Sequence, residues 1–204
     1  MRINEITQPA IDQAIDVLER ECGPYLQEIG GIENALVHKP LYRGSGDKFP
    51  SDSPIIKVPV RQDRRPRNTG IRDHERADEW FKENSSYGIP YRSASLFCSG
   101  SSDTAAIYAR RMNGAVSIVL PVGEYHYCWA PDVEDMTEGL DGMSWSLGEI
   151  IDIKNFLDDA SYIEDRNLAK AVASGHEIML HCKEAILIQQ TFIDDFLYSS
   201  WRKK

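Results

Sequence analysis

Apolar residues in the first part of the chain recur with the period of an amphipathic helix. They stand three or four positions apart, at Ile11, Ala14, Ile15 and Leu18. Together with Pro9, which suits a first helical turn, this spacing predicts a helix over residues 9–22. A second, short helix is expected over 25–29, before two glycines.

The rest of the chain predicts shorter elements of both kinds. Apolar runs predict strands over 55–60, 91–98, 116–122, 177–182 and 185–189. Helical spacing predicts helices over 73–84, 103–112, 149–157 and 164–173. Turn-forming and acidic residues predict loops over 44–54 and 130–148, and the aromatic residues of 191–201 are expected to pack on the core. Helices first and scattered strands later indicate an α+β fold.

Composition and charge bound the class of protein. The chain has 204 residues, of which 42% are hydrophobic, and this predicts one packed domain over 1–204 with 1–40 as a helical lead-in. The formal net charge of -9 argues against nucleic acid as the main partner. The four cysteines form no C-x-x-C pair, and no apolar run typical of a signal peptide or a membrane span occurs. We therefore expect a cytoplasmic protein with free thiols and no membrane partner.

One basic cluster interrupts this acidic chain, between Arg61 and Arg76. Its arginines stand at positions 61, 64, 65, 67, 72 and 76. Such a segment is typical of a site for phosphate or for an acidic partner, and equally of a solvated loop.

Three short segments carry the candidate chemistry. The first is Leu41-Tyr42-Arg43-Gly44, whose guanidinium can hold a phosphate through two parallel hydrogen bonds. The second is Phe97-Cys98-Ser99-Gly100-Ser101, directly before a predicted helix. The third is Glu177-Ile178-Met179-Leu180, which places a carboxylate at the start of a predicted strand. Taken singly, the three also fit a surface arginine, a helix cap and a charged strand edge.

In this order and spacing, the three segments resemble the Arg-Ser-Glu constellation of the ADP-ribosyltransferases, which cleave NAD at the nicotinamide–ribose bond. The resemblance covers roughly residues 41–190. It implies an ADP-ribosyltransferase-like α+β fold, with a split, mainly antiparallel β core and flanking helices. It also implies NAD as the substrate and three catalytic residues, Arg43, Ser99 and Glu177.

The resemblance assigns a role to each residue. Arg43 would clamp the NAD pyrophosphate, and Ser99 would support the nicotinamide pocket and orient Glu177. Glu177 would stabilise the positive charge that develops on the ribose as nicotinamide leaves. Gly44 would let the backbone approach the dinucleotide. The other residues expected to bind NAD or wall its pocket are Tyr42, Phe97, Ser101 and Tyr91.

Two positions depart from the family pattern. Gly100 stands where threonine is usual, and Gly175 stands where arginine-modifying members carry a second acidic residue. The missing acid predicts an acceptor other than arginine, on a host protein or another macromolecule, or plain hydrolysis of NAD. The alternative is a catalytically silent protein of the same fold that binds a host protein, such as a virion component or an inhibitor.

A second resemblance concerns the setting in which the protein acts. The segments 63–69, 91–93 and 121–125 are similar to segments of a set of small tailed-phage proteins with this transferase-like pattern. That resemblance implies a bacteriophage protein that works in the cytoplasm of the host.

Other chemistries find little support in the sequence. His176 and His181 lie five apart in one extended run, so their side chains point to opposite faces, and His126 has no ligand set near it. No metal site is therefore predicted. An acidic loop could chelate a cation but fits a solvated loop better, at Glu134, Asp135 and Glu138. The absence of a Gly-x-Ser-x-Gly elbow and of a Gly-x-Gly-x-x-Gly loop argues against a hydrolase triad and a Rossmann site.

Overall fold

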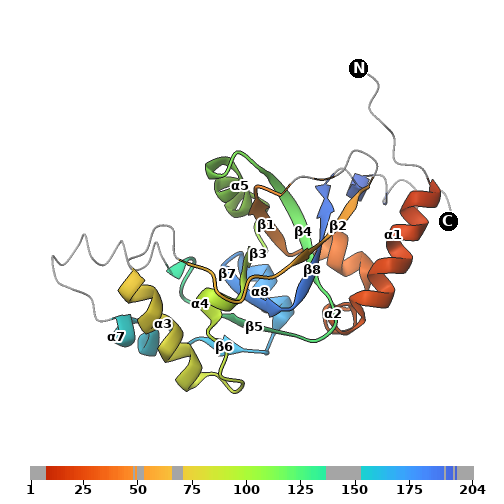
Figure 1. The fold of residues 1–204 in the computed structure, drawn as a ribbon. Helices are drawn as coiled ribbons and strands as arrows, with labels where there is room; N and C mark the ends of the chain where they lie inside the picture. The colour runs from red at the N-terminus through yellow and green to blue at the C-terminus, as the bar shows by residue number, and fades with distance from the viewer. Residues whose placement is uncertain are drawn as a thin grey trace.

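The fold is an eight-stranded antiparallel sheet with helices packed around it (Figure 1). It comes from a computed structural model that describes residues 8–47, 49, 53–65, 71–136, 153–190, 192–194 and 196. The α+β class and the antiparallel sheet with flanking helices are as the sequence predicts.

The sheet has the strand order β2-β8-β4-β1-β3-β7-β5-β6. Its strands are β1 (Tyr42–Ser45), β2 (Ile55–Pro59), β3 (Leu96–Ser99), β4 (Ala115–Pro121), β5 (Tyr125–Trp129), β6 (Ile163–Glu164), β7 (Glu177–Cys182) and β8 (Glu184–Gln189). Within the described residues, β1 and β3 share a single registered pair, Tyr42 with Ser99, whereas the other neighbouring strands share more. The junction between β1 and β3 therefore divides the sheet into two four-stranded halves.

Short helices flank the two halves of the sheet. They are α1 (Gln8–Glu21), α2 (Gly23–Ile29), α3 (Ile71–Asn84), α4 (Tyr91–Ala94), α5 (Ser102–Arg111), α7 (Ile153–Asp159), α8 (Leu168–Ser174) and the π-helical turn η1 (Asn34–His38). Helix α5 packs on β1 and β4, α3 packs on α4 and α7, and α4 packs on β7. Among the described helices, none is long and apolar enough to cross a membrane.

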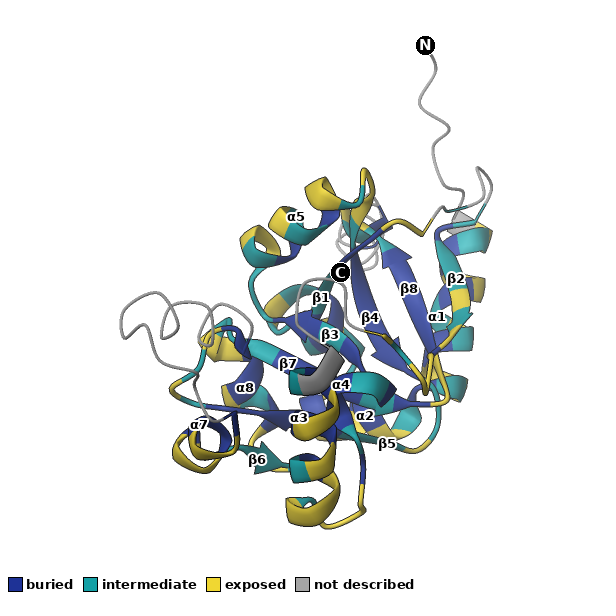
Figure 2. Cartoon of the chain, turned by 60° about the vertical axis from the view of Figure 1, so that its left-hand side comes forward, coloured by how far each residue is buried: buried dark blue, intermediate teal, exposed yellow. Residues whose placement is uncertain are grey.

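Two apolar clusters hold these layers together. The main cluster joins α1, α2 and α8 to both halves of the sheet, and a second, smaller cluster lies under α3, α4 and α7. Figure 2 shows the strands of the sheet largely buried, while α3, α5 and α7 keep an exposed outer face. Phe192 and Phe196 pack in the main cluster, as expected of the aromatic residues near the C-terminus; Trp201 lies outside the described residues.

The strongly periodic segments fold as the sequence predicts. The helices expected over 9–22, 25–29 and 73–84 are α1, α2 and α3. The strands expected over 55–60, 116–122, 177–182 and 185–189 are β2, β4, β7 and β8. Helix α5, expected over 103–112, begins one residue earlier because Ser101, rather than Ser102 or Asp103, caps it: the Ser101 hydroxyl accepts a hydrogen bond from the Thr104 amide.

The prediction for residues 91–98 is wrong in its first half. This segment is not one strand: residues 91–94 form the helical turn α4, and only Leu96–Ser99 form β3. The reason is a tertiary contact, because the Asp78 carboxylate on α3 accepts hydrogen bonds from the backbone amides of Arg92 (2.9 Å) and Ser93 (3.1 Å). Such a distant cap leaves no periodic signal in the sequence.

Several other boundaries differ from the predictions. Strands β5 and β6 and the turn η1 are not predicted, and the helix expected over 164–173 begins only at Leu168, after β6. Gly44 and Ser45, expected in a loop, belong to β1. The helix expected over 149–157 is α7 from Ile153 on. Residues 137–152 and most of 191–201, which include parts of these predictions, lie outside the described residues.

Candidate active site

The three sequence motifs meet at the junction between the two halves of the sheet. They lie on β1, β3 and β7, which are neighbours in that order. Tyr42 on β1 is paired with Ser99 on β3, and Ser99 is paired with Glu177 on β7. The backbone therefore sets these three residues in one row, although they are far apart in the sequence.

Ser99 fixes the turn that leads into Glu177. Its hydroxyl is buried and donates a hydrogen bond to the Gly175 carbonyl, at 2.5 Å, and accepts one from the Ser101 amide, at 3.0 Å. Gly175 ends α8 with a φ of +74°, a left-handed conformation that favours glycine. Ser99 thus positions Glu177 through the backbone of this turn rather than by direct contact.

Three arginines surround Phe97 on β3. Arg43 on β1 donates a hydrogen bond from Nη1 to the Phe97 carbonyl, at 3.1 Å. The guanidinium carbons of Arg64 and Arg92 each lie 4.3 Å from the centre of the Phe97 ring. Guanidinium groups on an aromatic face gain a cation–π attraction. This arginine cluster, defined as Arg43, Arg64 and Arg92, places positive charge within an otherwise acidic chain.

Glu177 forms a largely buried ion pair with Arg92. The Arg92 Nη1 atom lies 2.9 Å from Glu177 Oε1, and the two side chains are only 9% and 13% exposed. The Glu177 amide donates to the Glu134 carbonyl, at 2.7 Å, which ties β7 to the segment after β5. Glu177 is therefore held through both its backbone amide and its side-chain carboxylate.

Helix α3 holds Arg92 in place. The Asp78 carboxylate accepts the Arg92 and Ser93 amides, and the other Asp78 oxygen lies 3.6 Å from His74 Nε2. The same His74 nitrogen lies 3.1 Å from the Arg64 carbonyl. Burial lowers the pKa of His74, so the ring is neutral near pH 7. Asp78 and His74 thus link two members of the arginine cluster to one helix.

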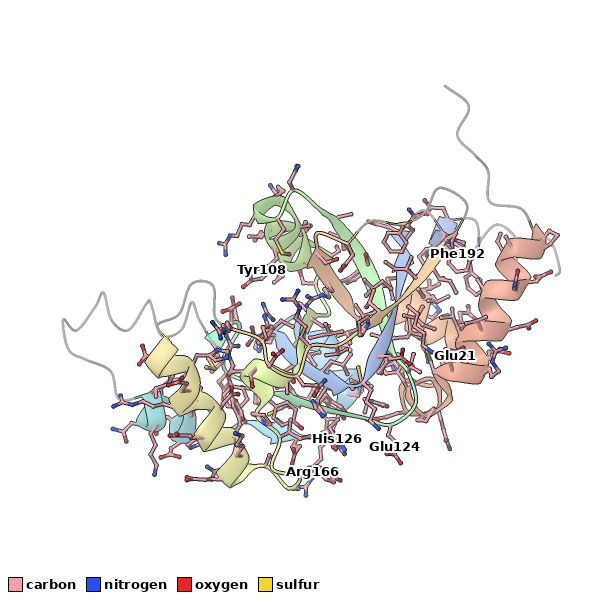
Figure 3. The ribbon with its side chains drawn as sticks, in the orientation of Figure 1. Glu21, Tyr108, Glu124, His126, Arg166 and Phe192 are labelled. Carbon is pink, nitrogen blue, oxygen red and sulfur yellow. The ribbon has the colours of Figure 1, made fainter. Side chains whose placement is uncertain are left out.

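The protonation of Glu177 is set mainly by its burial. Burial raises the pKa of this carboxyl to about 7, the Arg92 guanidinium opposes the rise, and the nearby Asp135 carboxylate adds to it. Asp135 is itself buried and accepts a hydrogen bond from the hydroxyl of Tyr108, which Figure 3 labels on α5. Glu177 therefore changes its charge close to neutral pH.

Three of the residues predicted to bind NAD have structural roles in the fold. A Cβ on Gly44 would lie 2.1 Å from the Ala105 carbonyl oxygen, so Gly44 makes room for α5. Ser101 uses its hydroxyl to cap α5. Tyr91 is fully buried in the second cluster, and its hydroxyl donates to Glu164 at 2.7 Å. Tyr42 and Phe97, both half-buried, stay beside Ser99 and Glu177.

Gly100 also has a packing role. A Cβ at this position would lie 1.7 Å from the carbonyl oxygen of Val172 in α8. Only glycine allows this close approach of α8 to the end of β3. The packing of this helix therefore explains why position 100 is glycine.

Sequence reasoning missed Arg64 and Arg92 as members of the site. Arg64 belongs to the arginine-rich segment, but Arg61, Arg65 and Arg76 of that segment are exposed while Arg64 is turned inward. Arg92 was hidden by the wrong prediction of a strand over 91–98. The signal that could have identified them is charge, because an arginine that is buried among apolar residues needs a carboxylate partner.

Other groups bear on which ligands the site can hold. Among the described residues, no three His, Cys, Asp or Glu side chains are grouped closely enough to hold a metal ion. All four cysteines are buried and free.

Comparison with models of protein families, with curated proteins and with solved structures found no significant match to this chain.

Proposed function

We propose that the protein is an NAD-dependent mono-ADP-ribosyltransferase whose site lies at the junction of the two half-sheets. The observation that carries the proposal is the row Tyr42–Ser99–Glu177, flanked by the arginine cluster. It brings a carboxylate for a cationic ribose and guanidinium groups for a pyrophosphate to one place. This is the pair of chemical needs that cleavage of NAD imposes.

The arginine cluster supplies the phosphate-binding part of the site. The planar guanidinium of Arg43 can hold a diphosphate by two parallel hydrogen bonds, and Arg64, from the segment after β2, adds a second cation beside the same residue, Phe97. Substrate entry requires one of the guanidinium groups to leave the Phe97 ring, which then becomes free to stack on nicotinamide.

Glu177 supplies the charge for the chemical step. The bond between ribose C1′ and the nicotinamide nitrogen breaks, and nicotinamide leaves neutral with the bonding electron pair. The positive charge left on the ribose is stabilised by the ionised Glu177 carboxylate. An acceptor nucleophile then bonds to C1′ and releases its proton to solvent. Arg92 favours the ionised form of Glu177 by opposing the effect of burial on its pKa.

The acceptor is a group on a host protein, and the setting is the cytoplasm of a phage-infected cell. An acidic side chain at position 175 would help to hold an arginine acceptor, but Gly175 has a φ of +74° that other residues adopt only with strain. The turn that Ser99 fixes therefore disfavours the acidic residue of arginine-modifying members, which favours a different acceptor.

Labelled NAD added to the purified chain and a bacterial lysate tests the proposal. Transfer to a lysate protein with release of nicotinamide is expected from the native chain and not from Glu177→Gln. Glu184→Gln, which removes a largely exposed carboxylate at the turn between β7 and β8, is the matched control. Release without transfer would instead assign NAD hydrolysis, and no release would refute both activities.

A silent binding protein is the second candidate, and one observation favours it. The Glu177 carboxylate is already paired with Arg92 and is only 13% exposed, as in a structural ion pair. In that case NAD binds without turnover, or does not bind, and Glu177→Gln changes stability alone.

A further inference from the structure

Two histidines face each other across strands β5 and β7, away from the candidate active site. His126 and His181 are a registered cross-strand pair, so their side chains stand on the same face of the sheet. Their rings lie 6.4 Å apart between centres and are nearly parallel, at 25°. His181 follows Glu177 on the same strand by four residues, which is about 13 Å.

Hydrogen bonds fix the same tautomer in both rings. His181 Nδ1 lies 2.7 Å from the Ala94 carbonyl oxygen, and His126 Nδ1 lies 2.6 Å from Asp165 Oδ2. A carbonyl or carboxylate oxygen only accepts, so each Nδ1 must carry the proton. This tautomer presents a bare lone pair at Nε2, and neither Nε2 has a hydrogen-bond partner among the described residues.

A hydrogen bond from Nδ1–H to an oxygen acceptor is typical of histidines that bind a metal ion through Nε2. A ligating imidazole usually donates its other N–H to a carboxylate or a backbone carbonyl, which orients the ring and makes it more basic. Asp165 and Ala94 provide one of each. The two hydrogen bonds run to different elements, to α4 for His181 and to the turn after β6 for His126.

The spacing and the local charge also fit a metal ion. With zinc–nitrogen bonds of about 2.0–2.1 Å, two imidazole rings on one tetrahedral ion have centres roughly 5 to 6 Å apart, close to the 6.4 Å observed. Asp165 and Glu164 add negative charge at this end of the sheet. The side chain of His126, labelled in Figure 3 on β5, is 29% exposed, so an ion can reach it from solvent.

We propose that His126 and His181 form a binding site for Zn²⁺ or a similar imidazole-binding divalent metal, with Asp165 orienting His126 and water completing the coordination. The site is independent of the proposed function. The alternation of side chains along the extended segment 176–181 argues against a metal ion shared by His176 and His181. It does not argue against one shared by His181 and His126, because His126 lies on the neighbouring strand β5. Such a site would pin β5 to β7 and to α4, the turn that carries Arg92.

Calorimetric titration of the metal-free full-length chain with ZnCl₂ tests the site. We expect one Zn²⁺ per chain, and at least tenfold weaker binding after His126→Gln or His181→Gln. The double variant should bind no more weakly than the weaker single variant, because either loss destroys a two-ligand site. Asp165→Asn should weaken binding about 10–100-fold, and asparagine tolerates the positive φ of 46° at this position.

His38→Gln is the matched control, because His38 lies in η1, where it is next to Glu33 and not to His126 or His181, so its loss should leave the affinity unchanged. A measurement on the native chain guards against variants that fail to fold: nitrogen-detected NMR should show the Nδ1–H tautomer for both rings, and Zn²⁺ should shift both Nε2 signals. The absence of Zn²⁺ binding would overturn the proposal. So would binding that persists in both histidine variants, or Nε2 signals that do not respond to Zn²⁺.

Discussion

Replacing Glu177 by glutamine should change how the stability of the protein depends on pH. Burial raises the pKa of this carboxyl from 4.5 to about 7 in the folded chain. Between these values the folded chain keeps a proton that the unfolded chain has released. Stability therefore falls as pH rises through this window, and the loss is complete above the folded-state pKa. Glutamine does not titrate, so Glu177→Gln removes this fall.

The size of the effect follows from the pKa. A pKa of about 7 in place of 4.5 makes the ionised carboxylate cost about 3 kcal/mol in the folded chain, of which 2 to 3 kcal/mol arise between pH 5 and pH 8. The loss of the Arg92 ion pair shifts the stability of the variant at every pH. The diagnostic quantity is therefore the change with pH of the difference between variant and native chain, and not its absolute value.

Urea denaturation at pH 5, 6, 7 and 8 measures this quantity, because the other titrating groups are common to both chains. The free energy of unfolding of Glu177→Gln, relative to the native chain, should rise by about 2 to 3 kcal/mol from pH 5 to pH 8. Glu184→Gln removes a carboxylate that is 48% exposed and should show less than about 0.5 kcal/mol of change. A flat difference for Glu177→Gln would refute the raised pKa, and a falling one would mean that the pKa is lowered.

Three further predictions concern the arginine cluster and the packing around it. Arg43→Lys should weaken NAD binding at least tenfold in calorimetry with an unchanged melting curve, because lysine lacks the planar fork; unchanged affinity would remove Arg43 from the site. Arg92→Met should move the midpoint of the rate–pH profile above pH 7, because Glu177 loses the cation that opposes protonation; an unmoved midpoint would show that Arg92 does not act on that carboxyl. Gly100→Ala should cost about 3 kcal/mol or more of stability, since its Cβ would meet a backbone carbonyl of α8 at 1.7 Å; Gly23→Ala, with nothing within 4 Å, is the control, and equal melting temperatures for the two variants would contradict the packing argument.

The sequence predicted those parts of the fold whose signal is local. Helix α1 and strands β4, β7 and β8 each carry a long apolar pattern, and their boundaries differ from the predictions by at most about two residues. Helix α4 and strand β6 are too short for a period to show, and each depends on contacts with distant residues: Asp78 for α4, and pairing with β5 for β6.

The candidate site divides in the same way. Tyr42, Ser99 and Glu177 belong to motifs that can be read along the chain, and the sheet sets them in one row. Arg64 and Arg92 join the site through the Phe97 ring and the Glu177 carboxylate, contacts that no spacing in the sequence encodes. Gly44, Ser101 and Tyr91, which are also predicted to bind NAD, have structural roles that the sequence does not reveal, for a common reason.

That reason is that small, hydroxyl and aromatic residues serve packing as readily as binding. The backbone of α5 occupies the space that a side chain at Gly44 would need. The Ser101 hydroxyl caps a helix, and the Tyr91 ring packs in an apolar cluster. Only the position of neighbouring elements decides between the two uses. A charged residue that must be buried, such as Glu177, is therefore the more informative sequence signal.

The rate of nicotinamide release from NAD at pH 8, where Glu177 is ionised, tests the central claim most directly. The native chain should release nicotinamide, and Glu177→Gln should do so about 10²–10³ times more slowly while still binding NAD, because the amide keeps the shape of the side chain and loses its charge. Glu184→Gln should match the native rate. A native chain that releases no nicotinamide, or a Glu177→Gln variant that keeps more than about half of the native rate, would contradict the account.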